Sequence, residues 1–342
     1  MHFLQKKVIA IIPSYFSDFT MIKGEANVSG QVITGIDVIN VLQLAMSNSI
    51  TPTKEMVTII PIDFTTDNEV TKYPLGIKSE TLKTRAIMVS TPKKNIYSVI
   101  SLLKSIDVEA IDISLGCIGD IYTFRTEQTD QEVDAVINIG ADKTEISAYN
   151  KGIVVKHTII NYGSKNVDND IAYMYKVDLD TARNLKETFA LANRTSTSLN
   201  ETKEVINKLG ETIKVNQFEL SEIVNSRIDE ILTLANQELN GLLSKKPDHI
   251  YITGGITNMV NFNQICREKL GKCAIIGNVN LIGLRNNKFS SAIGNIIYFV
   301  NKLKLKGKDY SMVNTNDMES LSTPKKTNNS MVDKVFGYFF GE

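Results

Sequence analysis

The 342 residues, 42% of them apolar and 22% charged, have an ordinary globular composition and are enough for two or more units with their own cores. The 38 basic residues balance 38 acidic ones and no basic stripe is interleaved with aromatic residues, which argues against a nucleic-acid partner. Three scattered cysteines exclude a disulfide framework or a zinc site built on them, and no segment has the roughly 18 to 20 apolar residues that span a bilayer.

The first ninety residues predict a small mixed α+β unit. Pro13 ends an apolar run that is too short for a signal peptide, so a buried strand is the better interpretation of that run. Pro61 interrupts a later strand, which favours an edge position in a sheet. The expected elements are a strand at 8–12, a helix at 37–46, and strands at 56–64 and 85–90.

From residue 92 onward the sequence predicts an α/β core, because buried apolar strands alternate with helices. The expected strands are 109–114, 135–139, 145–148, one within 151–163, 249–252 and 273–277. The expected helices are 94–106, 168–175, a polar helical region over 178–216, a long amphipathic helix at 218–243 and a closing helix at 289–300.

Two glycine turns in this core are candidate ligand sites. In VINIGADKTEIS, residues 136–147, a strand meets Gly140 and returns, so the hairpin tip can present backbone N–H groups and a threonine hydroxyl to a phosphate. In HIYITGGITNMVNF, residues 249–262, a strand runs into Gly254 and Gly255 and then a helix, where a flat ligand can lie against the backbone. Neither stretch matches GxxxxGK[ST] or GxGxxG, and each taken alone is more typical of a plain turn.

The order of these stretches resembles the second half of the actin/Hsp70/sugar-kinase nucleotide fold and, within it, the bacterial FtsA family. NIGADKTEISAYNKG resembles the family's second phosphate hairpin, YITGG its adenosine motif, and FSSAIG its second connecting segment. DNDIAYMYKVDLDTARNLK resembles the helix leading into subdomain 2B, ELSEIVNSRIDEIL the long 2B helix, and the elements before residue 90 subdomain 1C. The resemblance covers about residues 6–305.

The resemblance implies an α/β, actin-like (ribonuclease H-like) two-lobed fold with an FtsA-type 1C subdomain, N-terminally incomplete, plus a C-terminal amphipathic helix. The implied subdomains are 1C-like over 1–90, the remainder of 1A over 91–130, a 2A-like nucleotide subdomain over 131–177 and 247–290, and a 2B-like helical subdomain over 178–246. A closing helix at 291–305 returns to 1A, followed by a disordered linker at 306–330 and a membrane-targeting helix at 331–342.

The sequence departs from the family pattern at the places where a nucleotide would bind. The strands that precede 1C in the family, with the first phosphate hairpin, have no counterpart, as expected of a truncated or partial gene product or of a degenerate member that works without nucleotide. In the second hairpin Asn138 replaces an acidic residue, while Ala141 and Asp142 replace glycines. ATP with Mg²⁺ is therefore expected to bind weakly at most.

The resemblance implies one set of nucleotide-binding residues and no catalytic residue or protein-bound metal site. The set is Asn138, Gly140, Lys143, Thr144, Lys186, Thr253, Gly254 and Gly255. With one phosphate hairpin absent and Asn138 uncharged, efficient hydrolysis is not expected. The chain is accordingly expected not to be an enzyme, beyond a weak or lost ATPase.

The last twelve residues, MVDKVFGYFFGE, carry an apolar stripe when they are placed on a helix. They would make about 18 Å of helix, too short to span a bilayer, so a helix lying in the membrane interface is expected. Docking on the protein's own core is the alternative, and a coiled coil fits less well because the stripe is under two heptads long. The membrane-facing residues are Met331, Val332, Val335, Phe336, Phe339 and Phe340.

Together these features predict an actin-like cell-division adaptor, peripheral on the cytoplasmic face of the cell membrane at the division site. The resemblance implies that 2B binds the C-terminal peptide of the tubulin-like protein FtsZ, that 1C and 2A self-associate, and that later divisome proteins are recruited. One alternative is an ATP-dependent kinase or ATPase of the actin fold, which would need a first phosphate hairpin and a catalytic carboxylate. The other is a PilM-type pilus or competence adaptor, which the Phe-rich last segment disfavours.

Overall fold

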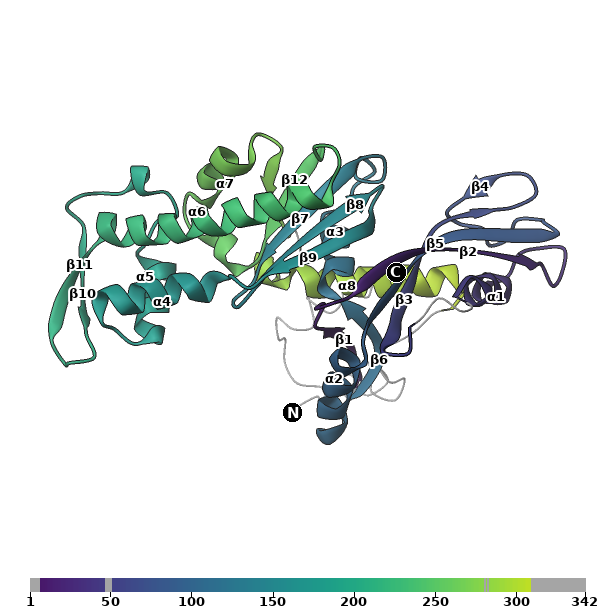
Figure 1. The fold of residues 1–342 in the computed structure, drawn as a ribbon, viewed down its shortest axis with the longest axis horizontal. Helices are drawn as coiled ribbons and strands as arrows, with labels where there is room; N and C mark the ends of the chain where they lie inside the picture. Colours follow the sequence, from purple (N-terminus) through teal and green to yellow (C-terminus); the bar gives the residue numbers. More distant parts are fainter. Residues whose placement is uncertain (1–6, 47–50, 280, 282, 309–342) are drawn as a thin grey trace, which may run out of the picture. The chain divides into compact units, whose positions relative to one another are not determined.

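The computed structural model describes residues 7–46, 51–279, 281 and 283–308 (Figure 1). All of these residues lie in the unit Met1–Lys308. The linker expected at 306–330, apart from its first residues, and the amphipathic helix expected at 331–342 lie outside the described residues and stay predictions. No helix in the described part is long and apolar enough to cross a membrane.

A five-stranded sheet in the order β13-β12-β7-β8-β9 carries the candidate site (Figure 1). Its strands are β7 (Val133–Ile139), β8 (Thr144–Asn150), β9 (Ile153–Ile160), β12 (His249–Thr253) and β13 (Ala274–Ile276). β13, β12 and β7 run parallel, while β7, β8 and β9 form an antiparallel meander. All five strands were predicted from the sequence, and the structure confirms them.

The two faces of this sheet differ in chemistry, because side chains alternate along each strand. Ala135, Ile137 and Ile252 belong to the apolar face, which packs with the long helix α6 (Gln217–Leu242) in the largest core cluster. On the other face, the strand register places Asn138 of β7 opposite Glu145 of β8 and Thr253 of β12. Polar side chains are thus gathered on one side of the sheet.

Helices α3 (Gly116–Phe124) and α8 (Ser290–Leu305) pack against this polar face. Their backbones touch, since a Cβ on Gly294 would lie 1.8 Å from the carbonyl oxygen of Gly119. Asn295 Nδ2, which donates to the Leu115 carbonyl oxygen at 3.2 Å, holds the two helices together at the same crossing. The closing helix was predicted at 289–300, whereas α3 has no counterpart among the predicted helices.

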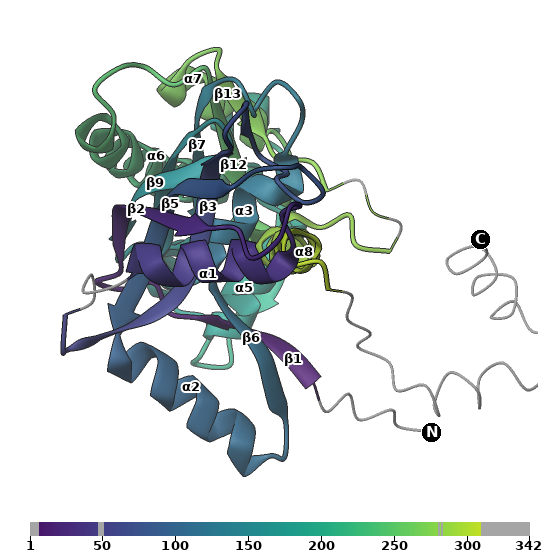
Figure 2. The same ribbon diagram turned by 90° about the vertical axis from the view of Figure 1, so that its right-hand side faces the viewer.

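An antiparallel sheet in the order β2-β5-β3-β4 forms the part of the chain expected to be 1C-like. Helix α1 lies across this sheet (Figure 2) and buries Val38 and Val41 against it. β3 pairs with β5 along its length but with β4 at two positions, so Pro61 lies toward the sheet edge, as predicted. The elements are β2 (Asp18–Asn27), α1 (Gly35–Met46), β3 (Lys54–Thr65), β4 (Val70–Thr71) and β5 (Thr81–Pro92).

The first strand of the chain lies in a separate two-stranded sheet and not in the four-stranded sheet. β1 (Lys7–Ile12) pairs in parallel with β6 (Glu109–Leu115), and α2 (Lys93–Ser105) packs beside this pair. The four-stranded sheet therefore begins at Asp18, and β1 lies outside it. The boundary of 1–90 itself stays a prediction.

The polar helical region expected over 178–216 is only partly helical. Helix α5 (Leu179–Thr188) follows α4 (Ser164–Tyr175), but a hairpin of β10 (Thr202–Ile206) and β11 (Thr212–Asn216) comes next. Gly210, with φ +80°, lies in the connecting turn. Only one face of the hairpin packs on the core. The exposed face gives this segment a polar composition, which is also typical of a solvent-exposed helix.

Replacing Gly294 by alanine is expected to destabilise the fold, because the added methyl group forces α3 and α8 apart. An overpacked core position costs about 1–3 kcal/mol in the free energy of unfolding, which chemical denaturation measures. Gly241→Ala is the matched control, because its Cβ would have no neighbour within 4 Å. We expect that variant to be neutral or stabilised by about 0.5–1 kcal/mol, and equal behaviour of the two variants would contradict the backbone contact.

Candidate functional site

The candidate site lies where the carboxyl ends of β7 and β12 meet the start of α8. Thr253, the last residue of β12, is fully buried and lies 3.0 Å (Oγ1) from Ser290 Oγ. Its hydroxyl also reaches the carbonyl oxygen of Asn287 at 3.2 Å, in the short 3₁₀ helix Asn287–Phe289. The segment FSSAIG is therefore joined directly to the glycine turn that follows β12.

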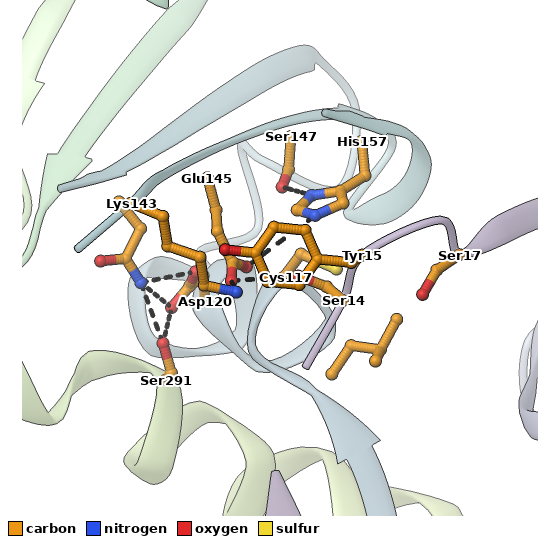
Figure 3. Close-up of polar contacts among 12 residues, drawn as sticks. Ser14, Tyr15, Ser17, Cys117, Asp120, Lys143, Glu145, Ser147, His157 and Ser291 are labelled. Atoms are coloured by element: carbon orange, nitrogen blue, oxygen red, sulfur yellow. Dashed lines mark hydrogen bonds and ion pairs between the residues drawn. The ribbon is translucent and has the colours of Figure 1, made fainter. Parts of the chain in front are cut away.

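Asp120 of α3 is the buried acid of the site (Figure 3). Its carboxylate accepts hydrogen bonds from Ser291 Oγ at 2.6 Å and from Asn138 Nδ2 at 3.1 Å. Burial raises the pKa of the Asp120 carboxyl to about 7, and Glu145 adds to this, while the two hydrogen bonds act against it. This group can therefore take up or release a proton near neutral pH.

Lys143 at the hairpin tip is held by an acid of the same hairpin. Its Nζ lies 2.5 Å from Glu145 Oε1 and 4.6 Å from the ring centroid of Tyr15 (Figure 3). Ser14 Oγ donates to the same Glu145 oxygen at 3.0 Å. The segment after β1 therefore reaches the hairpin, and Ser14, Tyr15 and Glu145 are site residues that sequence reasoning missed.

His157 of β9 lies on the same face of the sheet as Glu145, next to Ser147 (Figure 3). Its Nδ1 is 2.9 Å from Ser147 Oγ, and its Nε2 is 3.9 Å from Glu145 Oε2. Burial lowers the pKa of His157, and Glu145 acts in the opposite direction. The imidazole is therefore expected to be neutral at physiological pH, so Lys143 is the group that balances the charge of Glu145.

Gly254 of the second turn and Gly163, directly before α4, are used for close backbone packing. Gly254 has φ +102°, and a Cβ there would lie 2.1 Å from the carbonyl oxygen of Ile139. A Cβ on Gly163 would lie 2.4 Å from the carbonyl oxygen of Ala141. Gly254 thus seats the β12 turn against β7, which is a different reason for glycine than contact with a ligand.

The first turn of α4 is bonded to the hairpin tip. The amide of Ser164 donates to the Gly140 carbonyl oxygen and that of Lys165 to the Ala141 carbonyl oxygen, both at 2.9 Å. These bonds satisfy two of the amides that a helix leaves unpaired at its start. The helix and the hairpin are therefore one connected piece of backbone.

The remaining predicted residues are placed as follows. Lys186 of α5 is 2.6 Å (Nζ) from Asp168 Oδ1, and both side chains are almost fully buried. The Thr144 hydroxyl donates to the Tyr162 carbonyl oxygen at 2.8 Å. Gly255 starts a short 3₁₀ helix, Gly255–Asn258, so helix α7 (Phe262–Leu270) begins later than the glycine turn suggested.

Comparison with known proteins supports the order of these elements. A family model described as cell division protein FtsA matches residues 135–294, and one described as the SHS2 domain inserted in FtsA matches residues 19–90. This chain belongs to the FtsA family. The two matches cover the sheet of the candidate site and the separate four-stranded sheet.

Curated FtsA proteins share about a quarter of their residues with this chain. The cell division protein FtsA of Staphylococcus epidermidis is 26% identical over 269 residues, covering 77% of this chain and 58% of the relative. The FtsA of Enterococcus faecalis is 27% identical over 303 residues, covering 86% and 68%. The chain thus spans between 58% and 68% of the length of these two FtsA relatives.

Solved structures confirm the actin-like fold that the sequence predicted. The PilM–PilN type IV pilus biogenesis complex matches with a TM-score of 0.57 at 13% identity, covering 86% of this chain and 79% of the solved one. MreB5 of Spiroplasma citri, bound to ADP, matches with a TM-score of 0.51 at 14% identity, covering 63% and 68%. At these identities the likeness shows the fold alone.

According to the FtsA resemblance, Asn138 stands where the family has an acidic residue. In the structure another acidic residue, Asp120, lies beside Asn138. The carboxylate of Asp120 lies 3.1 Å from Asn138 Nδ2, across the gap between β7 and α3. Sequence reasoning missed Asp120, although it is the one charged residue in the apolar run GCIGDIYTF. The polar network of this FtsA-family site therefore keeps a carboxylate on α3.

The cations around the hairpin of this FtsA-family chain are engaged within the described part. Lys143 pairs with Glu145, Lys186 with Asp168, and Lys165 Nζ with Asp142 Oδ1 at 2.8 Å. A nucleotide phosphate would have to displace Glu145 before Lys143 could bind it. In this arrangement the residues do not form a ready cradle for Mg²⁺ and a nucleotide, and the predicted nucleotide contacts stay a prediction.

The pH dependence of stability tests the buried acid. Because the folded-state pKa of Asp120 is about 7 and the ordinary value is 3.8, the folded state keeps a proton in this range that the unfolded state has lost. The contribution of Asp120 to the free energy of unfolding should therefore fall by up to a few kcal/mol as pH rises from about 4 to 7, while buried His157, whose pKa is lowered, contributes with the opposite sign. Asp120→Asn should flatten part of this slope in chemical denaturation.

Asp134, whose pKa burial raises to about 6, contributes with the same sign, so the slope in Asp120→Asn is reduced and not abolished. Asp142→Asn is the control, because this acid is 73% exposed and its loss should leave the slope in place. An unchanged slope in Asp120→Asn would show that the acid is not protonated in the folded state.

Proposed function

We propose that this chain is an actin-like cell-division adaptor that links FtsZ to the cytoplasmic face of the membrane at the division site. The observation that carries the proposal is the pair of FtsA matches, at 19–90 and 135–294, on one actin-like fold. Self-association through the 1C-like and 2A-like surfaces and recruitment of later divisome proteins belong to the same proposal. ATP turnover is not part of the proposal, because Lys143 and Lys186 are paired with acidic residues of the protein, Glu145 and Asp168.

The membrane contact in this proposal comes from residues 331–342, and it is argued from the sequence alone. Each apolar side chain that is fully buried contributes about 1.5–3 kcal/mol, whereas ordering a backbone residue costs about 1–2 kcal/mol. Burial in the interface is partial, so one segment should bind reversibly. Several copies in one assembly would hold firmly, because each further segment binds at a high effective concentration.

Flotation with phospholipid vesicles tests the membrane contact. The full chain should float with the vesicles, and a chain ending at Ser330 should remain at the bottom of the gradient. Phe336→Asp places a charge on the apolar stripe and should also abolish flotation, because a charged group is costly to bury in an apolar region. Tyr338→Asp adds the same charge off the stripe and should float nearly normally.

Equal flotation of the full and shortened chains would contradict the membrane contact. Equal loss of flotation in Phe336→Asp and Tyr338→Asp would show that net charge, and not an apolar helical face, governs binding.

An exposed groove between α4 and α6 supports the proposed contact with FtsZ. The groove has a volume of about 370 Å³, and Tyr173 and Met174 on its rim are 83% and 60% exposed. Beside them Arg227 is oriented by Asp170, with Nε 2.6 Å from Oδ2. Arg227 also pairs with Glu230, with Nη1 2.5 Å from Oε2, so the exposed apolar side chains are the part of the groove that suits a short peptide with apolar groups. We propose that the C-terminal peptide of FtsZ binds here.

Binding of a fluorescent FtsZ C-terminal peptide, measured by anisotropy, tests this groove. Tyr173→Ala should weaken binding by roughly 10-fold or more, the usual effect of truncating an aromatic anchor. Tyr97→Ala on α2 is the control, since Tyr97 is another exposed tyrosine, on a different helix. Unchanged affinity in Tyr173→Ala would show that the peptide does not bind in this groove. If the unaltered chain does not bind the peptide, the proposed FtsZ contact is wrong.

A further inference from the structure

Three side chains that commonly bind metals meet at the opposite end of the five-stranded sheet. They are Glu132, Asp134 and His249, and their ligand atoms all lie within 4.8 Å of one another. Asp134 and His249 are register partners at the starts of the parallel strands β7 and β12. Asp134 is four residues before Asn138, or about 13 Å along the strand, so this cluster is separate from the candidate nucleotide-type site.

Asp134 is buried without the partners that a buried carboxylate needs. Its side chain is 0% exposed, and neither carboxylate oxygen accepts a hydrogen bond from any residue that the structure describes. The imidazole of His249 lies beside it, with Nδ1 3.4 Å from Asp134 Oδ1. That nitrogen is closer to Glu132 Oε2, at 2.9 Å, so a single N–H faces two carboxylates.

The cluster has more negative than positive charge. Asp248, directly before β12, is a third carboxylate, and its Oδ2 accepts from the Val133 amide at 2.9 Å. A buried charge is costly unless it is paired or bound to a metal ion. A bound cation would remove this cost.

We propose that Glu132, Asp134 and His249 bind a divalent transition-metal ion, with Zn²⁺ as the best-fitting case. The ion takes the place of the proton on His249 Nδ1, so all three side chains bind it as anions or as neutral imidazole. One imidazole nitrogen with two carboxylates suits Zn²⁺, Mn²⁺ or Fe²⁺ better than Mg²⁺ or Ca²⁺, which prefer oxygen ligands alone.

The geometry agrees with such an ion. Zinc bonds of about 2.0–2.2 Å in tetrahedral geometry put ligand atoms roughly 3.3 Å apart, and Nδ1 lies 2.9 Å and 3.4 Å from the two carboxylate oxygens. Gln128 Nε2 donates to Glu132 Oε1 at 2.7 Å, which leaves Oε2 turned toward the cluster. Glu132 and His249 are 22% and 26% exposed, so an ion can enter and water can occupy a fourth position.

A bound ion would tie the start of β12 to the start of β7, two strands that are far apart in the chain. The sheet of the candidate site would then be fixed at both ends: by the polar network with α8 at one and by the metal at the other. This role is independent of the proposed contacts with membrane and FtsZ. Either can fail without affecting the other.

Calorimetric titration of the metal-free full chain with ZnCl₂ near neutral pH tests the site. We expect about one ion per chain, and binding more than roughly 10-fold weaker in His249→Gln and in Glu132→Gln. Cys273→Ser is the matched control, because Cys273 is the thiol with partial exposure and its loss should leave binding unchanged. Absorption with Co²⁺ should show no intense thiolate band, in agreement with nitrogen and oxygen ligands.

Asp134→Asn separates a metal site from a plain ion pair. If Asp134 is a metal ligand, Asp134→Asn should raise the melting temperature of the metal-free protein near neutral pH. The same variant should abolish the rise in melting temperature that Zn²⁺ causes. If the acid serves only to pair with His249, the amide should lower the melting temperature, and Zn²⁺ should leave that of the unaltered chain unchanged. The second result, or an affinity that survives in both His249→Gln and Glu132→Gln, would overturn the proposal.

Discussion

The backbone contact between α3 and α8 at Gly119 and Gly294 is the constraint on which the site depends. Helices usually pack with axes 8–10 Å apart, separated by their side chains. Two facing glycines remove that layer and bring the start of α8 to the polar face of the sheet. Asp120 then meets Ser291 at hydrogen-bond distance. Any side chain at the crossing would open the network to water.

A sheet that buries polar side chains among apolar ones on one face must satisfy each of those polar groups. At the carboxyl end of β7 and β12 this is done by neighbours, since Asn138 and Thr253 bond to α3 and α8. At the opposite end Asp134 accepts no hydrogen bond in the described structure, and it shares the His249 imidazole with Glu132. The two ends therefore solve the same physical problem differently, by hydrogen bonds at one and, as we propose, by a metal ion at the other.

Much of the fold could be predicted from the sequence, because β7, β12 and α6 are strongly apolar on a face that packs against the core. The hairpin β10–β11 could not, because only one of its faces packs and its other residues are polar. The residues at the site were named from the sequence only in part: Asn138 and Gly254 were among them, and their nucleotide contacts stay a prediction. Asp120 depends on the crossing of α3 with α8, and the Lys186–Asp168 pair depends on how two helices meet. No local pattern encodes either contact.

Helix α4 begins on the carbonyl oxygens of the hairpin tip and ends at the groove that holds Tyr173. Twelve helical residues make a stiff rod of about 18 Å, so its two ends move together. A change in the pairing of Lys143 with Glu145 would shift the tip, and the rod would carry that shift to the groove. One short helix thereby joins the hairpin tip to the groove.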